Sequence, residues 1–202
     1  MIVIPEMDGL TFDSNAHLYS LNGVTIPSVT QLMKPLSDSE YGGIDPKHLE
    51  IAAARGTAVH EAIENYIKFG IMDIPPEFHG YVDGFQEWWE SQRPTVVASE
   101  LRFYHKYMWY GGTADLLAEI NGELSLIDFK TTSKVIHSSC AVQLEAYAQA
   151  LQSHGIKVKA KYILHLKPDG RWVFLPFTTN DLESWSVFDA LKTVYNYIQK
   201  NK

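Results

Sequence analysis

Apolar residues recur along this chain at two different spacings, which separate predicted helices from predicted strands. Between residues 46 and 69 they recur every three or four positions, as on one face of an amphipathic helix, and Gly70 ends the pattern. The same spacing predicts three further long helices, at 77–91, 138–154 and 180–199.

Extended segments occupy the beginning and the middle of the chain. Residues 17–26 are predicted to form a hairpin with Asn22-Gly23 as its two-residue turn. A short helix is expected to open at Pro27-Ser28, with a hydroxyl side chain as cap, and a polar, Gly-rich loop to follow over 37–45. Runs rich in Val, Leu, Ile and aromatic residues predict five more strands, at 95–107, 109–120, 123–131, 157–166 and 171–176.

The order of these elements indicates a fold class. Helices come first, then three strands, a helix, two strands and a last helix, which predicts an α/β sandwich with a central mixed β-sheet flanked by helices. A length of 202 residues fits one domain over 1–202. Within it we expect a hairpin and short helix (1–45), a helical part (46–94) and a sheet core with C-terminal helices (95–202).

Composition narrows the class of protein further. Hydrophobic residues make up 46% of the chain and charged residues 20%, as in soluble globular proteins. No apolar run approaches the roughly 18 residues that a membrane helix needs, and the N-terminus has no basic segment typical of a signal peptide. We therefore expect no membrane partner and a cytoplasmic location. The single cysteine, Cys140, excludes a disulfide framework and a cysteine-ligated iron–sulfur cluster.

Charge is divided unevenly between the two parts of the chain. The net charge of −7 at first argues against a nucleic-acid partner. However, residues 1–128 hold 7 Lys and Arg against 19 Asp and Glu, whereas residues 129–202 hold 10 against 5. Because the local field matters more than the sum, an acidic metal site can coexist with a basic strand-binding face.

Three charged residues are predicted to meet on two adjacent strands. Asp115 lies on the strand that enters the Asn121-Gly122 turn, and Asp128 and Lys130 lie on the strand that leaves it. Since residues two apart in a strand share a face, Asp128 and Lys130 point the same way. Their neighbours are apolar, and buried charges are costly unless they are paired or bind a metal.

Such a cluster suits phosphodiester hydrolysis. Carboxylates hold Mg²⁺ or Mn²⁺, which prefer oxygen ligands. The ion lowers the pKa of a bound water and neutralises charge that develops on the phosphate, while a lysine stabilises the transition state. Asp-x-Lys alone is a weak signal, and a solvated strand face is the simpler reading of it.

Two helices add polar pairs at a spacing of four residues. His60 and Glu64 share one face of the first long helix, and Gln143 and Tyr147 share one face of the helix after the Asp-x-Lys strand. Taken alone, His60 reads as a partly buried helix histidine, and the second pair as part of an ordinary amphipathic helix.

Taken together and in this order, these residues resemble the RecB-like branch of the PD-(D/E)XK nuclease superfamily. The opening Tyr19-x-x-x-Gly23-x-x-x-Pro27-Ser-Val-Thr is similar to the start of phage-type and mitochondrial genome-maintenance exonucleases in that branch. The other matching pieces are Arg55-Gly-Thr-x-x-His60-x-x-x-Glu64, Glu100, Gly112-Thr-Ala-Asp115, Ile127-Asp128-Phe-Lys130-Thr-Thr and Gln143-x-x-x-Tyr147.

The resemblance implies a restriction-endonuclease-like fold and a role for each matching residue. His60, Asp115, Asp128 and the backbone carbonyl of Phe129 would bind the metal, and Lys130 would be the catalytic lysine. Glu100 is either a supporting group or second-metal ligand, or a surface carboxylate. The resemblance also names substrate contacts, namely Gln143, Tyr147 and Arg55, although Arg55 reads equally well as a helix-surface arginine.

Three hypotheses for function follow. The leading one is a Mg²⁺- or Mn²⁺-dependent exonuclease that hydrolyses single-stranded DNA or DNA ends in recombination, repair or phage DNA processing. It would act alone or beside a separate recombinase, single-strand-binding protein or helicase. The second is a catalytically inactive module that binds nucleic acid or protein. The third is a hydrolase of another phosphoester. Tyr107, Trp109 and Tyr110 lie at a predicted strand–strand turn, where a tip can be exposed, and are candidates for stacking on bases.

Overall fold

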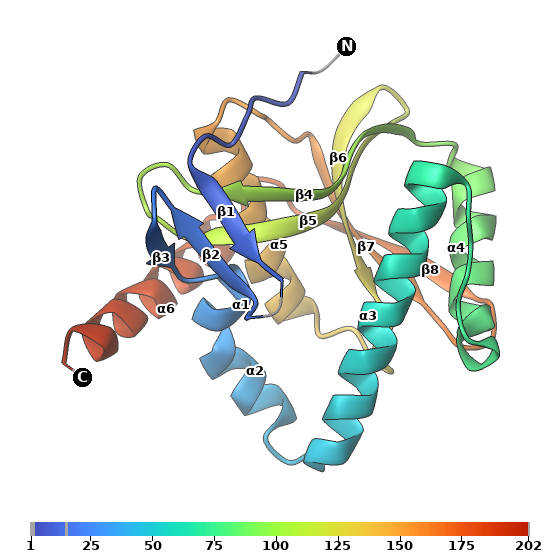
Figure 1. The fold of residues 1–202 in the computed structure, drawn as a ribbon, viewed down its shortest axis with the longest axis horizontal. Coiled ribbons are helices and arrows are strands. Elements are labelled where there is room, and N and C mark those ends of the chain that lie inside the picture. The colour runs from blue at the N-terminus through green and yellow to red at the C-terminus, as the bar shows by residue number, and fades with distance from the viewer. Residues whose placement is uncertain (1–2, 15, 202) are drawn as a thin grey trace.

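A five-stranded mixed sheet forms the centre of the molecule, as seen in the computed structural model, which describes residues 3–14 and 16–201 (Figure 1). Its strand order is β4-β5-β6-β7-β8, and every neighbouring pair is antiparallel except β6 and β7, which are parallel. The strands are β4 (Thr95–Tyr104), β5 (Gly111–Ile120), β6 (Glu123–Lys130), β7 (Ala160–Leu166) and β8 (Trp172–Phe177).

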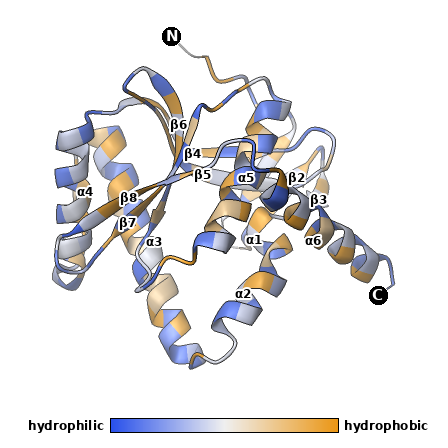
Figure 2. Ribbon diagram, turned by 180° about the vertical axis from the view of Figure 1, so that it is seen from behind, coloured by the Kyte–Doolittle hydropathy of each residue, from blue (hydrophilic) through white to orange (hydrophobic). Residues whose placement is uncertain are grey.

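Helices cover both faces of this sheet, which confirms the predicted fold class (Figure 1). One hydrophobic cluster packs one face of the sheet against α3 (Pro46–Phe69) and α4 (His79–Gln92). A second cluster packs the other face against α5 (His137–Ser153) and α6 (Leu182–Lys200). Figure 2 shows both hydrophobic and hydrophilic colours on the helices, as expected for amphipathic helices with one buried face.

Alternation along the central strands explains why both faces are covered. Leu117 and Leu126 belong to the cluster on the α5 side, whereas their neighbours Leu116 and Ile127 belong to the cluster on the α3 side, and all four are fully buried. Successive side chains of a strand point to opposite faces, so strands that are apolar at every position need a helix layer on each side.

The boundaries of α3 follow from local chemistry. The side chain of Asp45 accepts a hydrogen bond from the backbone N–H of Lys47 over 2.9 Å, and Pro46 occupies the first helical position. Gly70 ends the helix in the left-handed conformation, with φ 71°. The predicted range of this helix is therefore confirmed at both ends.

A second, three-stranded sheet precedes the helices. The predicted hairpin is present as β2 (Leu18–Leu21) and β3 (Val24–Ile26), and its turn residues Asn22 and Gly23 have positive φ, as a two-residue turn requires. The hydrophobic pattern does not predict β1 (Leu10–Asp13), which pairs with β2 and completes a β1-β2-β3 meander.

Three predicted boundaries differ from those of the structure. The short helix α1 (Val29–Leu32) is followed by a second helix, α2 (Lys34–Tyr41), which includes residues 37–41 of the predicted loop. An ion pair of 2.8 Å between Lys34 and Asp38, which lie one helical turn apart, stabilises α2. The strands expected to reach 107 and to start at 109 are shorter. His105 Nδ1 accepts hydrogen bonds from two backbone N–H groups of the following turn, which ends β4. The helix predicted from residue 77 begins as a short 3₁₀ turn, Pro76–Phe78, before α4.

Among the described residues, no helix is long and apolar enough to cross a membrane.

A buried ion pair connects α5 to β7 of the sheet. Lys161 of β7 donates to Glu145 of α5, and each residue is only 1% exposed. The Glu145 carboxylate also accepts from Gln149 Nε2 over 2.7 Å and from the backbone N–H of Asp181 over 3.1 Å, just before α6. Glu145 therefore links α5, β7 and the start of α6.

Removing one member of this pair is expected to destabilise the fold. Lys161→Met leaves the Glu145 carboxylate buried without its cation, and we expect a loss of about 3–5 kcal/mol of unfolding free energy in urea denaturation. Adding Glu145→Gln to Lys161→Met removes the stranded charge and should recover part of that loss. A single variant as stable as the wild type would contradict this assignment.

Candidate active site

Two central strands, β5 and β6, carry the carboxylates at the centre of the candidate site. Leu116 pairs with Ile127, so Asp115 and Asp128 are the next residues along the two strands. They are 8% and 3% exposed, and the backbone N–H of Phe129 donates to Asp115 Oδ2 over 2.7 Å. The antiparallel pairing thus buries two carboxylates close together, as their positions on either side of the turn predicted.

α3 brings an imidazole to this pair. His60 Nδ1 lies 3.5 Å from Asp115 Oδ1, and His60 Nε2 lies 3.1 Å from the carbonyl oxygen of Phe129. Burial by itself lowers the pKa of His60, but the carboxylates of Asp115 and Asp128 outweigh burial and raise it to about 9. Without a metal, a protonated His60 therefore supplies positive charge beside the two aspartates.

Glu100 of β4 completes the cluster. One ligand atom each from His60, Glu100 and Asp115 lie within 4.8 Å of one another. Burial, together with the negative charge of Asp115, raises the pKa of Glu100 to about 7. Glu100 also has φ 48°, a left-handed conformation that is uncommon for residues other than glycine and costs backbone energy. Of the two readings of Glu100, the geometry favours a group of the site over a surface carboxylate.

Lys130 lies on the same face of β6 as Asp128, as the spacing of two residues predicted. Its Nζ is 2.7 Å from Asp128 Oδ2 and donates to Gln143 Oε1 over 2.9 Å. Gln143 Nε2 in turn donates to the hydroxyl of Tyr147 over 3.0 Å. Burial lowers the pKa of Lys130, but the Asp128 carboxylate more than compensates and raises it above its usual range, so the ammonium stays charged.

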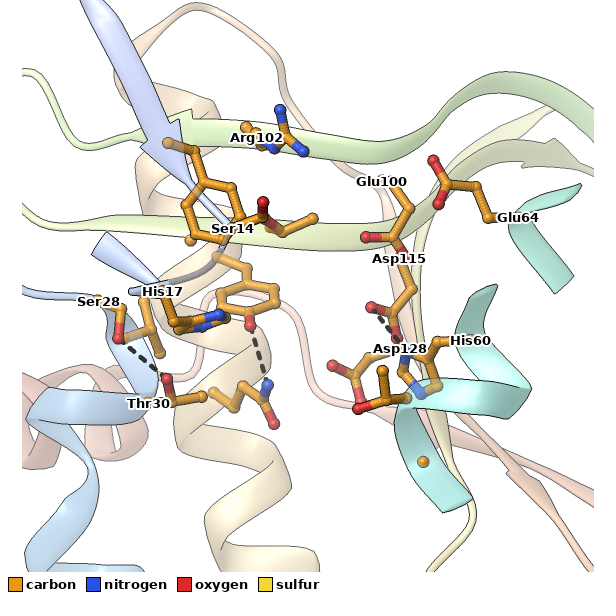
Figure 3. Close-up of a pocket in the computed structure, with 18 of the residues that line it drawn as sticks. Ser14, His17, Ser28, Thr30, His60, Glu64, Glu100, Arg102, Asp115 and Asp128 are labelled. Carbon is orange, nitrogen blue, oxygen red and sulfur yellow. Dashed lines mark hydrogen bonds and ion pairs between the residues drawn. The ribbon is translucent and has the colours of Figure 1, made fainter. Parts of the chain in front are cut away.

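These groups line one side of a cavity of about 520 Å³. Figure 3 shows Glu64, Glu100, Asp115, Asp128 and His60 on that side, with Ser28, Thr30, His17, Ser14 and Arg102 across the cavity. Glu64 forms an ion pair with Lys68 one helical turn away. The sequence motifs predict the residues of the acidic side. They do not assign the opposite side to the site, because its residues are close together only in the fold.

Two sets of predicted substrate contacts lie elsewhere. Arg55 is not part of the cavity lining. Its guanidinium lies 5.5 Å from the ring centroid of Tyr81, beside a neighbouring groove. Tyr110 is fully buried, and its hydroxyl donates to the Ala146 carbonyl over 2.8 Å, so the base-stacking prediction is wrong for this residue. Tyr107 and Trp109 are exposed but do not line the cavity.

The donor set fits a hard divalent cation. It combines an imidazole with carboxylate oxygens, the ligand types that suit Mg²⁺ and Mn²⁺ sites. Among the described residues, the buried Oδ2 of Asp128 has no partner other than the Lys130 ammonium, 2.7 Å away in an ion pair. A buried carboxylate oxygen without a hydrogen bond is costly, and coordination to a cation would satisfy it.

A family comparison agrees with this chemistry. The sequence model of the PD-(D/E)XK nuclease superfamily matches residues 73–190, more than half of the chain. A solved structure described as the crystal structure of SSO0001 aligns over 83% of this chain and 75% of its own length, with 14% sequence identity and a TM-score of 0.43. The comparison with curated proteins gives no match.

Replacing Glu100 with Gln is expected to stabilise the metal-free protein at pH 8. The pKa of Glu100 rises from 4.5 to about 7 on folding. As the pH rises, the unfolded chain therefore loses this proton at a lower pH than the folded protein does. The free energy of unfolding falls as the pH rises from 4.5 to about 7. Glu100→Gln removes the cost at pH 8 but changes little at pH 4, which thermal unfolding of both proteins would measure.

Glu119→Gln, on the neighbouring strand, serves as the matched control and should not change the unfolding temperature in this pH-dependent way. Added Mn²⁺ should stabilise the wild type more than the Glu100→Gln protein. Equal unfolding temperatures of wild type and Glu100→Gln at pH 8 would argue against a half-buried, negatively charged Glu100.

Proposed function

The chain belongs to the PD-(D/E)XK nuclease superfamily, and from that premise we propose that it is a Mg²⁺- or Mn²⁺-dependent deoxyribonuclease. Within that activity, we propose an exonuclease that hydrolyses phosphodiester bonds of single-stranded DNA or DNA ends. The observation that carries the proposal is the convergence of His60, Glu100, Asp115, Asp128 and Lys130 on one cavity.

Each residue has a role that its position supports. His60, Asp115 and Asp128 would hold the ion together with the Phe129 carbonyl, which already lies against the imidazole. Glu100 is close enough to His60 and Asp115 to share in this binding. When bound, the ion would acidify a water molecule and neutralise phosphate charge.

Lys130 supplies the positive charge that the transition state requires. Its ammonium is fixed between Asp128 and Gln143, so it needs little reorganisation when negative charge develops on the phosphate. The hydrogen bond from Gln143 to Tyr147 in turn holds the Gln143 amide in place. In this proposal, Gln143 and Tyr147 position the substrate strand next to the lysine.

The preference for DNA and for free ends rests on the ordered motifs. They extend from Tyr19 to Tyr147 and resemble the RecB-like branch, with its phage-type and mitochondrial genome-maintenance exonucleases. A net charge of −7 disfavours tight non-specific binding. We therefore propose that a separate recombinase, single-strand-binding protein or helicase delivers the substrate.

Replacing Lys130 with Ala is expected to lower DNA cleavage by several powers of ten, since the lysine acts mainly on the transition state. The measurement is hydrolysis of end-labelled DNA by purified protein with Mg²⁺ or Mn²⁺. Lys159→Ala is the matched control, because this lysine is exposed at the start of β7 and does not line the cavity. Undiminished activity of Lys130→Ala would falsify the mechanism.

Linear and circular single strands, compared in the same assay, test the end requirement. An exonuclease degrades the linear strand and leaves the circle intact. Cleavage of both at similar rates would assign endonuclease action instead. A wild-type protein that binds DNA but cleaves neither form would support the inactive binding module.

A further inference from the structure

We propose that the β1-β2-β3 meander and Arg102 form a binding wall for one unpaired nucleobase, opposite the metal-binding residues. This inference rests on the proposed function and deepens it. The N-terminal wall, as we call it, consists of Phe12, His17, Tyr19 and Arg102. All four line the same cavity as His60, Asp115 and Lys130.

The meander is attached to the sheet next to the carboxylates. Tyr19 is 2% exposed, and its hydroxyl shares a hydrogen bond of 2.7 Å with Thr113 Oγ1, two residues before Asp115 on β5. Gly111 N–H donates to the Pro27 carbonyl over 2.9 Å. A Cβ at Gly111 would lie 2.9 Å from Tyr19 Cγ, so this close approach requires glycine. The opening sequence motif thus fixes the wall relative to the site.

The surface of the wall is aromatic and cationic. The Phe12 ring lies 4.6 Å from the Tyr19 ring and 5.2 Å from the His17 ring, which is nearly perpendicular to it at 86°. Arg102 Cζ lies 4.8 Å above the Phe12 ring. The side chains of His17 and Arg102 are exposed and, with the residues that the structure describes, form no hydrogen bond or ion pair, so both are available to a ligand.

This arrangement matches the two ends of a nucleotide. A phosphate would lie at the metal-binding side beside Lys130, while its base would lie against the rings across the cavity (Figure 3). Aromatic side chains stack on any base, because every base has a π face. The planar guanidinium of Arg102 can rest on Phe12 and still donate its N–H groups to a phosphate or a base edge.

A base held in this way cannot remain stacked in a duplex. The wall therefore gives a physical reason for single-stranded substrates, one that is independent of family resemblance. It also predicts that the enzyme senses the base next to the cleaved bond without selecting its identity.

An abasic substrate tests the wall directly. We compare cleavage of a labelled single strand with that of the same strand carrying one abasic nucleotide at successive positions from the end. We expect kcat/KM at the bond next to the abasic position to fall about tenfold or more in the wild type. The double variant Phe12→Leu/His17→Asn should cleave both strands at equal, reduced rates. Leucine keeps an apolar side chain at residue 12 but removes the aromatic ring, and asparagine tolerates the left-handed backbone at residue 17, where φ is 50°.

Val24→Ala is the matched control, because Val24 is exposed on β3 of the same meander and outside the cavity, and it should retain the wild-type discrimination. Equal wild-type rates on both strands, or discrimination that survives in the double variant, would overturn the wall. Fluorescence anisotropy of the same two strands with Ca²⁺ and Lys130→Ala protein separates the two proposals. Tighter binding of the intact strand supports the wall even if the wild type cleaves nothing, and equal binding rejects it even if the wild type cleaves DNA.

Discussion

The carboxylates buried on β5 and β6 repel each other, and the surrounding structure has to offset this repulsion. Asp115 and Asp128 are almost inaccessible to solvent, and Glu100 adds a third carboxyl group. Their charge is balanced locally by His60, by Lys130 and by a backbone N–H. Because these partners come from α3 and from β6 itself, the helix and the sheet must be in place together before the carboxylates can be buried.

The sequence predicted the features that depend on short-range rules. Two residues on one strand share a face, so Asp128 and Lys130 were correctly placed together. A bare strand pattern could not reveal that Glu100 adopts a left-handed backbone, which turns its side chain into the cluster. Nor could it place His60 beside Asp115, for which the family motif was needed. β1 and α2 were missed because β1 depends on pairing with β2 and α2 has a polar sequence with few helix signals.

The two sides of the cavity come from different parts of the chain. The family match begins at residue 73 and includes the strands with Glu100, Asp115, Asp128 and Lys130. His60 and three residues of the N-terminal wall, Phe12, His17 and Tyr19, lie before it, whereas the fourth, Arg102, lies on β4 within the match. The sheet core thus provides the carboxylates and the lysine to which we assign hydrolysis. The first part of the chain closes the cavity and supplies most of the surface to which we assign substrate selection. The hydrogen bond between Tyr19 and Thr113 joins the two parts within two residues of Asp115.

The Glu145–Lys161 pair restricts the movement of α5. Positions 143 and 147 of this helix face Lys130, while position 145 points to the opposite side and is bound to β7 and to the residue before α6. The helix is thus restrained against rolling about its own axis. Since the restraint lies in the dry interior, dissolved ions cannot screen it. The side of the cavity that contains Lys130 should accordingly be its most rigid part. Movements that accommodate a bound DNA strand should therefore occur on the opposite side.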